Sequence, residues 1–272
     1  MRATSRMIQV NGARIACSDS GCGDPVLMIA GTGSTGRVWD AYQVPDLHAA
    51  GFRTITFTNR GVPPSDECER GFTLADLAAD TAALIEQVAG GPCRVVGTSL
   101  GAQVAQEVAL ARPDLVTQAV FMATRGRTDA MRAAATRAAA ALYDSGVELP
   151  PAYAAAVRAL QNLSPHTLRD RHQVEDWLPL FEYAERDGPG VRAQLELGLL
   201  PDRLADYRDI TVPCLVIAFE DDVVTPPYLG REVADAIPGA RFETVPRCGH
   251  YGYLEDASAV NKILRDFFRT SN

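Results

Sequence analysis

The pentapeptide Gly97-Thr98-Ser99-Leu100-Gly101 places a serine hydroxyl between two glycines. A short apolar run precedes it and a helix-forming run follows it, which predicts a strand, a tight turn and a helix with Ser99 at the apex. A side chain at Gly97 or Gly101 would collide with the backbone of the neighbouring strand or helix. The amide of Leu100 would lie at the helix N-terminus, where it can donate to an oxyanion. The pattern therefore predicts a nucleophilic serine with an oxyanion donor beside it.

A serine hydroxyl is a weak nucleophile at neutral pH and needs a general base, for which histidine is the usual residue. Of the four histidines, His250 directly follows the last predicted strand, in a loop that emerges at the same sheet edge as Ser99. We therefore assign the base to His250. The other three lie in an early helix or in a long helical segment, where surface or packing roles are expected: His48, His166 and His172.

The base in turn needs a carboxylate that orients the imidazole and stabilises its charged form. The acidic run Glu220-Asp221-Asp222 follows the predicted strand 214–219, and each of its members could reach a histidine at that edge. We choose Asp222 because it lies farthest past the strand and within the loop, and we keep Asp221 as the alternative. With this acid, the chain contains all three groups of an acyl-transfer site.

The elements that must position these groups are predicted from hydrophobic patterning. Short strands alternate with amphipathic helices, which implies an α/β fold with a mostly parallel eight-stranded sheet and helices on both faces. The first two strands form a hairpin around Asn11-Gly12, a dipeptide typical of a two-residue turn. The predicted strands are 7–10, 13–17, 25–30, 53–58, 94–97, 115–123, 214–219 and 241–245.

The region between the sixth and seventh strands shows a different pattern. Alanine-rich helical stretches follow one another there, separated by prolines, without a convincing strand. We interpret this region as an insertion that covers one end of the sheet. The chain is thus divided into an α/β core, residues 1–124 and 211–272, and a helical cap, residues 125–210.

The order of serine, acid and histidine, each after its own strand, resembles the α/β-hydrolase fold family, in particular its capped serine hydrolases and esterases. The resemblance extends over residues 8–268. Asn59-Arg60-Gly61 with Ser65 is similar to the family's D-x-R-G-x-G-x-S loop. Cys248-Gly249-His250 with Glu255 is similar to its G-H-x-x-x-x-E stretch.

The turn Ala30-Gly31-Thr32 stands in the place of the family's His-Gly-x oxyanion turn. The resemblance implies that the backbone amide of Thr32 joins that of Leu100 as an oxyanion donor. The chain departs from the family pattern at Ala30, where a histidine is usual, and at Thr58, where an aspartate is usual. Neither departure removes a catalytic group, because the donor is an amide, but both imply altered hydrogen bonding beneath this loop.

The resemblance implies hydrolysis of a carboxylic ester or thioester of a hydrophobic small molecule through an acyl-enzyme, with no cofactor and no metal ion. The same three residues could instead support C–C bond hydrolysis of a diketone, or transfer or cyclisation of an acyl chain. A non-catalytic ligand receptor on the same fold is a second alternative. A haloalkane dehalogenase is disfavoured, because its nucleophile at position 99 would be a carboxylate.

Substrate contacts are harder to predict. The candidates are Gly31, Met122, Arg125, Trp177, Phe181 and Tyr251. Aromatic residues at helical spacing are more often core than ligand contacts, so the cap core is the alternative for Trp177 and Phe181. Four arginines follow the sixth strand: Arg125, Arg127, Arg132 and Arg137. They could bind a substrate carboxylate or an acidic carrier protein, or form a solvated helix face.

Composition limits the remaining possibilities. The chain has 272 residues, of which 47% are hydrophobic, enough for a sizeable core. Its net charge of −8 disfavours nucleic acid and anionic membranes as main partners. The six scattered cysteines, the absence of a membrane-spanning run and the absence of a secretory signal predict a cytoplasmic protein with reduced thiols. A monomer or homodimer with a small-molecule substrate is expected, with an acyl carrier protein as an alternative partner.

Overall fold

The computed structural model describes residues 4–68, 71–183 and 188–270. The strands in these ranges are β1 Thr4–Val10, β2 Ala13–Gly21, β3 Pro25–Ile29, β4 Arg53–Phe57, β5 Cys93–Thr98, β6 Val116–Met122, β7 Cys214–Phe219 and β8 Arg241–Val245. They form one eight-stranded sheet in the order β1-β2-β4-β3-β5-β6-β7-β8. β2 pairs antiparallel with both β1 and β4, and the remaining pairs are parallel. The mostly parallel eight-stranded sheet predicted from the sequence is confirmed.

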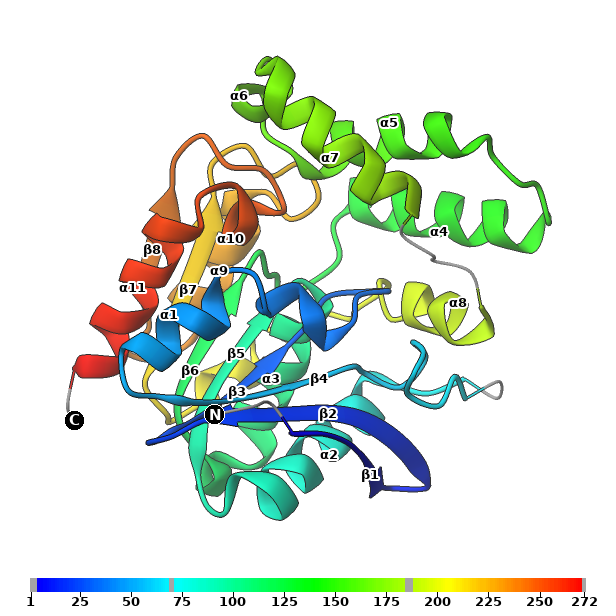
Figure 1. Cartoon of the computed structure of the whole chain (residues 1–272). Coiled ribbons are helices and arrows are strands. Elements are labelled where there is room, and N and C mark those ends of the chain that lie inside the picture. Colours follow the sequence, from blue (N-terminus) through cyan, green and yellow to red (C-terminus); the bar gives the residue numbers. More distant parts are fainter. Residues whose placement is uncertain (1–3, 69–70, 184–187, 271–272) are drawn as a thin grey trace.

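Helices cover both faces of this sheet (Figure 1). One face packs against α2 Leu74–Leu84, α3 Leu100–Ala111 and α9 Pro227–Ala236. The other face packs against α1 Gln43–Ala49 and α11 Ala257–Arg269. Successive strand residues point to opposite faces, so Leu27 and Ile29 join the first core while Val26 and Met28 join the second. The shorter elements are η1 Gly36–Trp39, η2 Ile85–Ala89, η3 Pro113–Leu115, η4 Asp206–Asp209 and α10 Gly252–Glu255.

Five helices separate β6 from β7, and we call them the helical insertion. They are α4 Ala130–Asp144, α5 Pro151–Asn162, α6 Pro165–Leu168, α7 Arg171–Tyr183 and α8 Pro189–Glu196. Figure 1 shows α4 to α7 at the end of the molecule opposite to α2. Residues 184–187, which fall within the predicted cap, lie outside the described residues. No helix in the described ranges is both long and apolar enough to cross a bilayer.

The turn between β5 and α3 is the most tightly packed part of the backbone near the predicted nucleophile. A Cβ at Gly97 would lie 2.1 Å from the carbonyl oxygen of Gly101, and a Cβ at Gly101 would lie 2.2 Å from that of Ile29. Ser99 itself adopts φ 55° and ψ −120°, a conformation that non-glycine residues rarely take. Close packing of three backbone segments therefore imposes the sharp turn that the two glycines predicted.

Alanine substitutions at two helical glycines, Gly101 in α3 and Gly230 in α9, test this packing. Gly101→Ala is expected to lower the free energy of unfolding by about 3 kcal/mol or more, because backbone atoms must move to admit the methyl group. Gly230→Ala in α9 is the control, since its Cβ would meet its nearest atom, Val216 Cγ1, at 3.4 Å. That control is expected to change stability by less than about 1 kcal/mol. Chemical denaturation measures both variants, and equal stabilities would contradict the packing argument.

Candidate active site

Ser99 lies at the carboxyl end of β5, directly before α3. Its backbone amide donates to the carbonyl oxygen of Met122 in β6 at 3.0 Å. Its own carbonyl oxygen accepts from the amides of Ala102 and Gln103 at 3.0 and 3.2 Å. The neighbouring strand and the first turn of α3 thus hold the serine in its unusual backbone conformation, with its side chain above the sheet edge.

His250 and Asp222 lie next to this serine. His250 Nε2 is 3.0 Å from Ser99 Oγ, and His250 Nδ1 is 2.8 Å from Asp222 Oδ2. His250 is only 5% exposed and Asp222 only 3%. A carboxylate at Nδ1 favours the imidazole form with its proton on that nitrogen, which leaves the Nε2 lone pair facing the serine hydroxyl. The geometry therefore allows Ser99 to donate its proton to His250.

The loop after β7 supplies the hydrogen bonds that a buried carboxylate requires. Asp222 Oδ1 accepts from the amides of Val224 and Thr225, both at 2.8 Å, and Oδ2 accepts from Thr225 Oγ1 at 2.7 Å. The alternative acid, Asp221, is half-buried, and its amide donates to the carbonyl oxygen of Cys248. Within the described ranges the Asp221 carboxylate makes no hydrogen bond to His250, so Asp222 is the acid that contacts the imidazole.

Glu255 connects the histidine loop to the helical insertion. Its Oε2 accepts from the amide of Gly249 at 2.6 Å, next to His250. Its Oε1 accepts from the amide of Ser164 at 2.8 Å and from Thr167 Oγ1 at 2.6 Å. The glutamate of the predicted G-H-x-x-x-x-E stretch thus orients the loop that carries the histidine and attaches it to α6.

The loop after β3 passes directly over the serine. A Cβ on Gly31 would lie 3.2 Å from Ser99 Cβ, which explains why a glycine suits this position. Thr32 and Leu100 line the same cavity as Ser99. Leu100 is the first residue of α3, so its amide lies at the positive end of the helix dipole. The two predicted oxyanion donors therefore belong to two backbone segments that meet at the serine.

Hydrogen bonds beneath this loop involve both positions at which the chain departs from the family pattern, Ala30 and Thr58. The Asn59 side-chain amide donates to the carbonyl oxygen of Ala30 at 3.3 Å. Thr58 Oγ1 accepts from the amide of Gly36 at 3.1 Å. Thr58 and Asn59 thus hold the backbone of the loop after β3, the predicted oxyanion loop, from below.

Gln194 of α8, which is not among the predicted site residues, holds the same loop from the side of the insertion. Its Oε1 accepts from the amide of Gly33 at 2.8 Å, and its Nε2 donates to the carbonyl oxygen of Arg60 at 2.8 Å. It is 1% exposed, so both bonds form away from bulk water. A glutamine within an amphipathic helix carries no motif, and only its long-range contacts reveal its position.

A cavity of about 610 Å³ lies above Ser99. The loops after β3, β7 and β8 line it from the core, and α4, α5 and α8 line it from the insertion. Three of the predicted substrate contacts, Gly31, Arg125 and Tyr251, are among its lining residues, together with Ser99 and His250. The serine hydroxyl is therefore accessible to a small molecule from this cavity.

The other three predicted contacts do not line this cavity. Met122 is completely buried in β6 within the core. Trp177 and Phe181 stack on each other at 5.6 Å between ring centroids, and Phe181 stacks on Tyr251 at 5.9 Å. These aromatic side chains form the core of the insertion and support Tyr251 from behind, as the alternative interpretation of their helical spacing stated.

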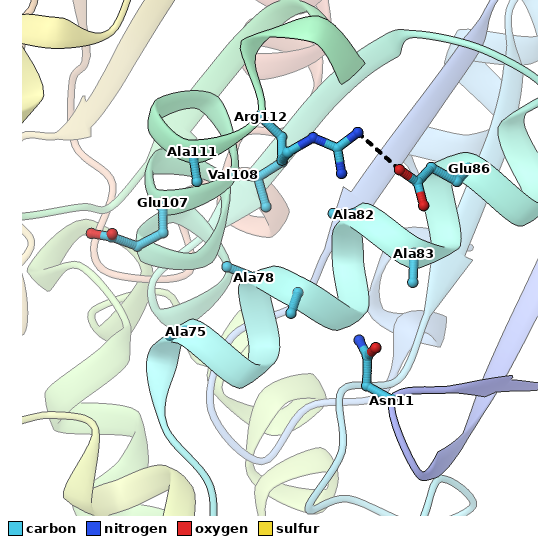
Figure 2. A pocket seen from close by; sticks show the side chains of 11 residues that line it. Asn11, Ala75, Ala78, Ala82, Ala83, Glu86, Glu107, Val108, Ala111 and Arg112 are labelled. Carbon is cyan, nitrogen blue, oxygen red and sulfur yellow. Dashed lines mark hydrogen bonds and ion pairs between the residues drawn. The ribbon is translucent and has the colours of Figure 1, made fainter.

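A second cavity, of about 410 Å³, lies between α2 and α3. Figure 2 shows that its walls are mostly alanine side chains, with the ion pair of Glu86 and Arg112 on one side. Among the described residues, no serine, cysteine or histidine lines it. In the described part of the chain, no three His, Cys, Asp or Glu side chains are grouped closely enough to hold a metal ion. The cavity at Ser99 is therefore the stronger candidate for a reaction site.

Comparison with known proteins agrees with this assignment of the fold. The alpha/beta hydrolase family model matches residues 26–263. The putative non-heme bromoperoxidase BpoC of Mycobacterium tuberculosis is 51% identical, covering 93% of this chain and 97% of that protein. Its crystal structure superposes with a TM-score of 0.90 over 93% of this chain and 95% of that one.

More distant relatives carry the names of hydrolases. A putative carbamate hydrolase RutD of Variovorax paradoxus is 28% identical, with 90% of this chain and 91% of that protein covered. The 2-hydroxy-6-oxononadienedioate/2-hydroxy-6-oxononatrienedioate hydrolase of Cupriavidus pinatubonensis is 26% identical, with 97% and 95% covered. Together with the family match and the eight-stranded sheet, these likenesses show that the chain is an enzyme of the α/β hydrolase family.

Proposed function

We propose that this enzyme is a serine hydrolase that cleaves a carboxylic ester or thioester of a small molecule with an apolar portion. The observation that supports this proposal is the chain of hydrogen bonds from Asp222 through His250 to Ser99 at 2.8 and 3.0 Å. These groups meet beside a cavity that can hold a small molecule. Serine, histidine and aspartate in this order of contact are suited to acyl transfer.

In the proposed acylation step, Ser99 Oγ attacks the substrate carbonyl carbon while His250 Nε2 accepts the hydroxyl proton. Asp222 keeps Nδ1 protonated and stabilises the imidazolium that forms. The backbone amides of Leu100 and Thr32 donate to the oxyanion of the tetrahedral intermediate. His250 then gives its proton to the departing alcohol or thiol, and the acyl group stays on the serine.

In the deacylation step, His250 removes a proton from a water molecule that attacks the acyl-enzyme. The same two amides stabilise the second tetrahedral intermediate, and the proton returns to Ser99 as the acid leaves. We assign the helical insertion, within residues 125–210, the role of a cap that forms the wall of the cavity opposite the sheet. The acyl chain would then lie between the core loops and α4, α5 and α8.

Other reactions of the same three residues are distinguished by product analysis. The relative from Cupriavidus pinatubonensis is named for hydrolysis of an oxo-dienedioate, so C–C bond hydrolysis is the first alternative. A panel of aryl esters, acyl thioesters and β-diketones separates these activities, and cyclic or transferred products would reveal cyclisation or acyl transfer. A bromide oxidation assay with hydrogen peroxide tests the activity named for the 51% identical relative.

The acyl donor, the oligomeric state and the cellular location follow from the sequence predictions alone. An acyl carrier protein as acyl donor, a monomeric or homodimeric state and a cytoplasmic location stay predictions from the sequence. A serine-directed phosphonate separates a catalyst from a ligand receptor on the same fold, because only an activated Ser99 is labelled rapidly.

The first test replaces the nucleophile. Ser99→Ala is expected to lower kcat for an activated aryl ester by about 10,000-fold or more, because no acyl-enzyme can form. Ser34→Ala is the matched control, since Ser34 also lines the cavity but contacts neither His250 nor Asp222 in the described residues. Turnover of Ser99→Ala at the rate of the unmodified enzyme would refute the assignment.

The second test separates the two neighbouring acids. Asp222→Asn is expected to reduce kcat by about 10,000-fold, because an asparagine amide stabilises the wrong imidazole tautomer. Asp221→Asn should retain nearly full activity, since its carboxylate does not contact the imidazole. Steady-state kinetics on the same aryl ester measures both variants. A larger loss in Asp221→Asn than in Asp222→Asn would reverse the assignment.

The third test concerns the oxyanion loop. Gln194→Leu removes the hydrogen bonds to Gly33 and Arg60, so we expect kcat to fall about 10-fold while KM changes less. Gln161→Leu is the control, since Gln161 also lines the cavity but is exposed. Equal kcat values for the two variants would show that Gln194 does not position the loop.

A further inference from the structure

The four arginines that follow β6 occupy different environments. Arg127 forms a two-pronged ion pair with Glu232, with Nε and Nη2 at 2.8 and 2.7 Å from its carboxylate oxygens. Arg137 is exposed on α4. Arg125 and Arg132, by contrast, line the cavity that contains Ser99. Two of the four arginines therefore border the cavity beside Ser99.

Arg125 is a buried cation without a counterion. It is 3% exposed. Its Nη1 donates to Thr128 Oγ1 at 2.7 Å and to the carbonyl oxygen of Arg127 at 3.4 Å, and its Nη2 donates to that of Gly198 at 3.0 Å. All these acceptors are uncharged. In the described residues, no carboxylate forms an ion pair with Arg125, and its Nε makes no hydrogen bond.

Arg132 adds a second positive charge to the cavity, which makes binding of an anion there more favourable. Burial and the neighbouring charge of Arg132 lower the pKa of Arg125 to about 10. Burial also lowers the pKa of Arg132, which forms no ion pair with a described carboxylate. Arginine side chains stay protonated at neutral pH, so the cavity is lined by two partly desolvated positive charges. Bringing such charges together is unfavourable unless an anion compensates them.

Asp129 is the nearest acidic group in the cavity, but its oxygens are used elsewhere. Its Oδ1 accepts from the backbone amide of Arg132 at 2.7 Å, as the N-cap of α4, and its Oδ2 accepts from the hydroxyl of Tyr228. Its charge favours the protonated form of both arginines without contacting either guanidinium. The Asp222 carboxylate also favours the charged form of Arg132, but its oxygens are hydrogen-bonded within its own loop and to His250. In the described residues, no carboxylate therefore forms an ion pair with either guanidinium.

We propose that the substrate carries a carboxylate, which binds to Arg125 and Arg132 while its ester or thioester carbonyl lies at Ser99. This proposal rests on the proposed hydrolase function of Ser99. A guanidinium binds a carboxylate through two parallel N–H groups. On Arg125 the Nε hydrogen and one Nη2 hydrogen are unused, and Nε and Nη2 are the atoms with which Arg127 binds Glu232. The expected substrate is therefore an amphiphilic acid.

The test compares matched acids and neutral esters, with the charge on either side of the scissile bond. The acyl-side pair is 4-nitrophenyl hydrogen adipate and its methyl ester. The leaving-group pair is 4-acetoxybenzoate and its methyl ester. In at least one pair, we expect kcat/KM to favour the acid about 10-fold or more. The pair that shows this preference identifies the side of the substrate that bears the carboxylate.

The arginines are then replaced one at a time. Arg125→Gln and Arg132→Gln are each expected to lower the acid-to-ester ratio of kcat/KM by about 10- to 100-fold. Arg137→Gln, on the exposed side of α4, should leave the ratio unchanged. Arg125→Lys keeps the charge without the two-pronged geometry, so we expect an intermediate ratio. If Arg125→Gln does not fold, the Arg125→Lys and Arg132→Gln ratios decide the proposal.

These measurements distinguish failure of the carboxylate subsite from failure of the proposed hydrolase function. If the unmodified enzyme prefers the acid in neither pair, the carboxylate subsite is refuted while the hydrolase function stands. An acid preference that survives in Arg125→Gln and Arg132→Gln would also refute the subsite, since other groups would then bind the carboxylate. If neither acids nor neutral esters are hydrolysed, the proposed hydrolase function fails, and the subsite proposal fails with it.

Discussion

The close approach of three backbone segments at the end of the sheet is the constraint on which the active-site region depends. The Gly97 and Gly101 positions leave no room for a Cβ between β5, α3 and the end of β3. This contact holds Ser99 in a backbone conformation with positive φ, at the apex of the turn between β5 and α3. The same contact brings the Gly31 loop within van der Waals distance of the serine. This packing thus places the Ser99 hydroxyl beside the segments that carry Thr32 and Leu100, whose amides we propose as oxyanion donors.

Near this turn, hydrogen bonds hold the side chains of Asp222, Glu255 and Gln194. Asp222 is held by the amides and hydroxyl of its own loop before it contacts His250, so the carboxylate stays oriented without water. Glu255 and Gln194 extend these connections into the helical insertion. A movement of the insertion would therefore shift both the loop that carries His250 and the predicted oxyanion loop. The position of the cavity wall is thus linked to the positions of Ser99 and His250.

Two arginines make the cavity locally positive, which the amino-acid composition does not reveal. The chain as a whole is acidic, with a net charge of −8, yet its candidate reaction site contains two partly desolvated cations. Because the net charge of the chain gives no long-range attraction for an anion, the proposed carboxylate would be recognised by the local fork of the guanidinium. The paired Arg127 and the unpaired Arg125, two residues apart, show how strongly the environment decides the role of one residue type.

The residue pattern alone predicted the α/β fold, Ser99, His250 and an acid after the seventh strand, with Asp222 chosen and Asp221 as the alternative. It could do so because turn chemistry is local, and because parallel strands bring the residues that follow them to one edge. Only the tertiary structure showed which acid contacts the imidazole, since neighbouring residues of a loop point in different directions. It also placed Trp177 and Phe181 in the core of the insertion, Gln194 beside the oxyanion loop and Arg125 in the cavity. These outcomes depend on contacts between residues far apart in the chain, which hydrophobic periodicity does not encode.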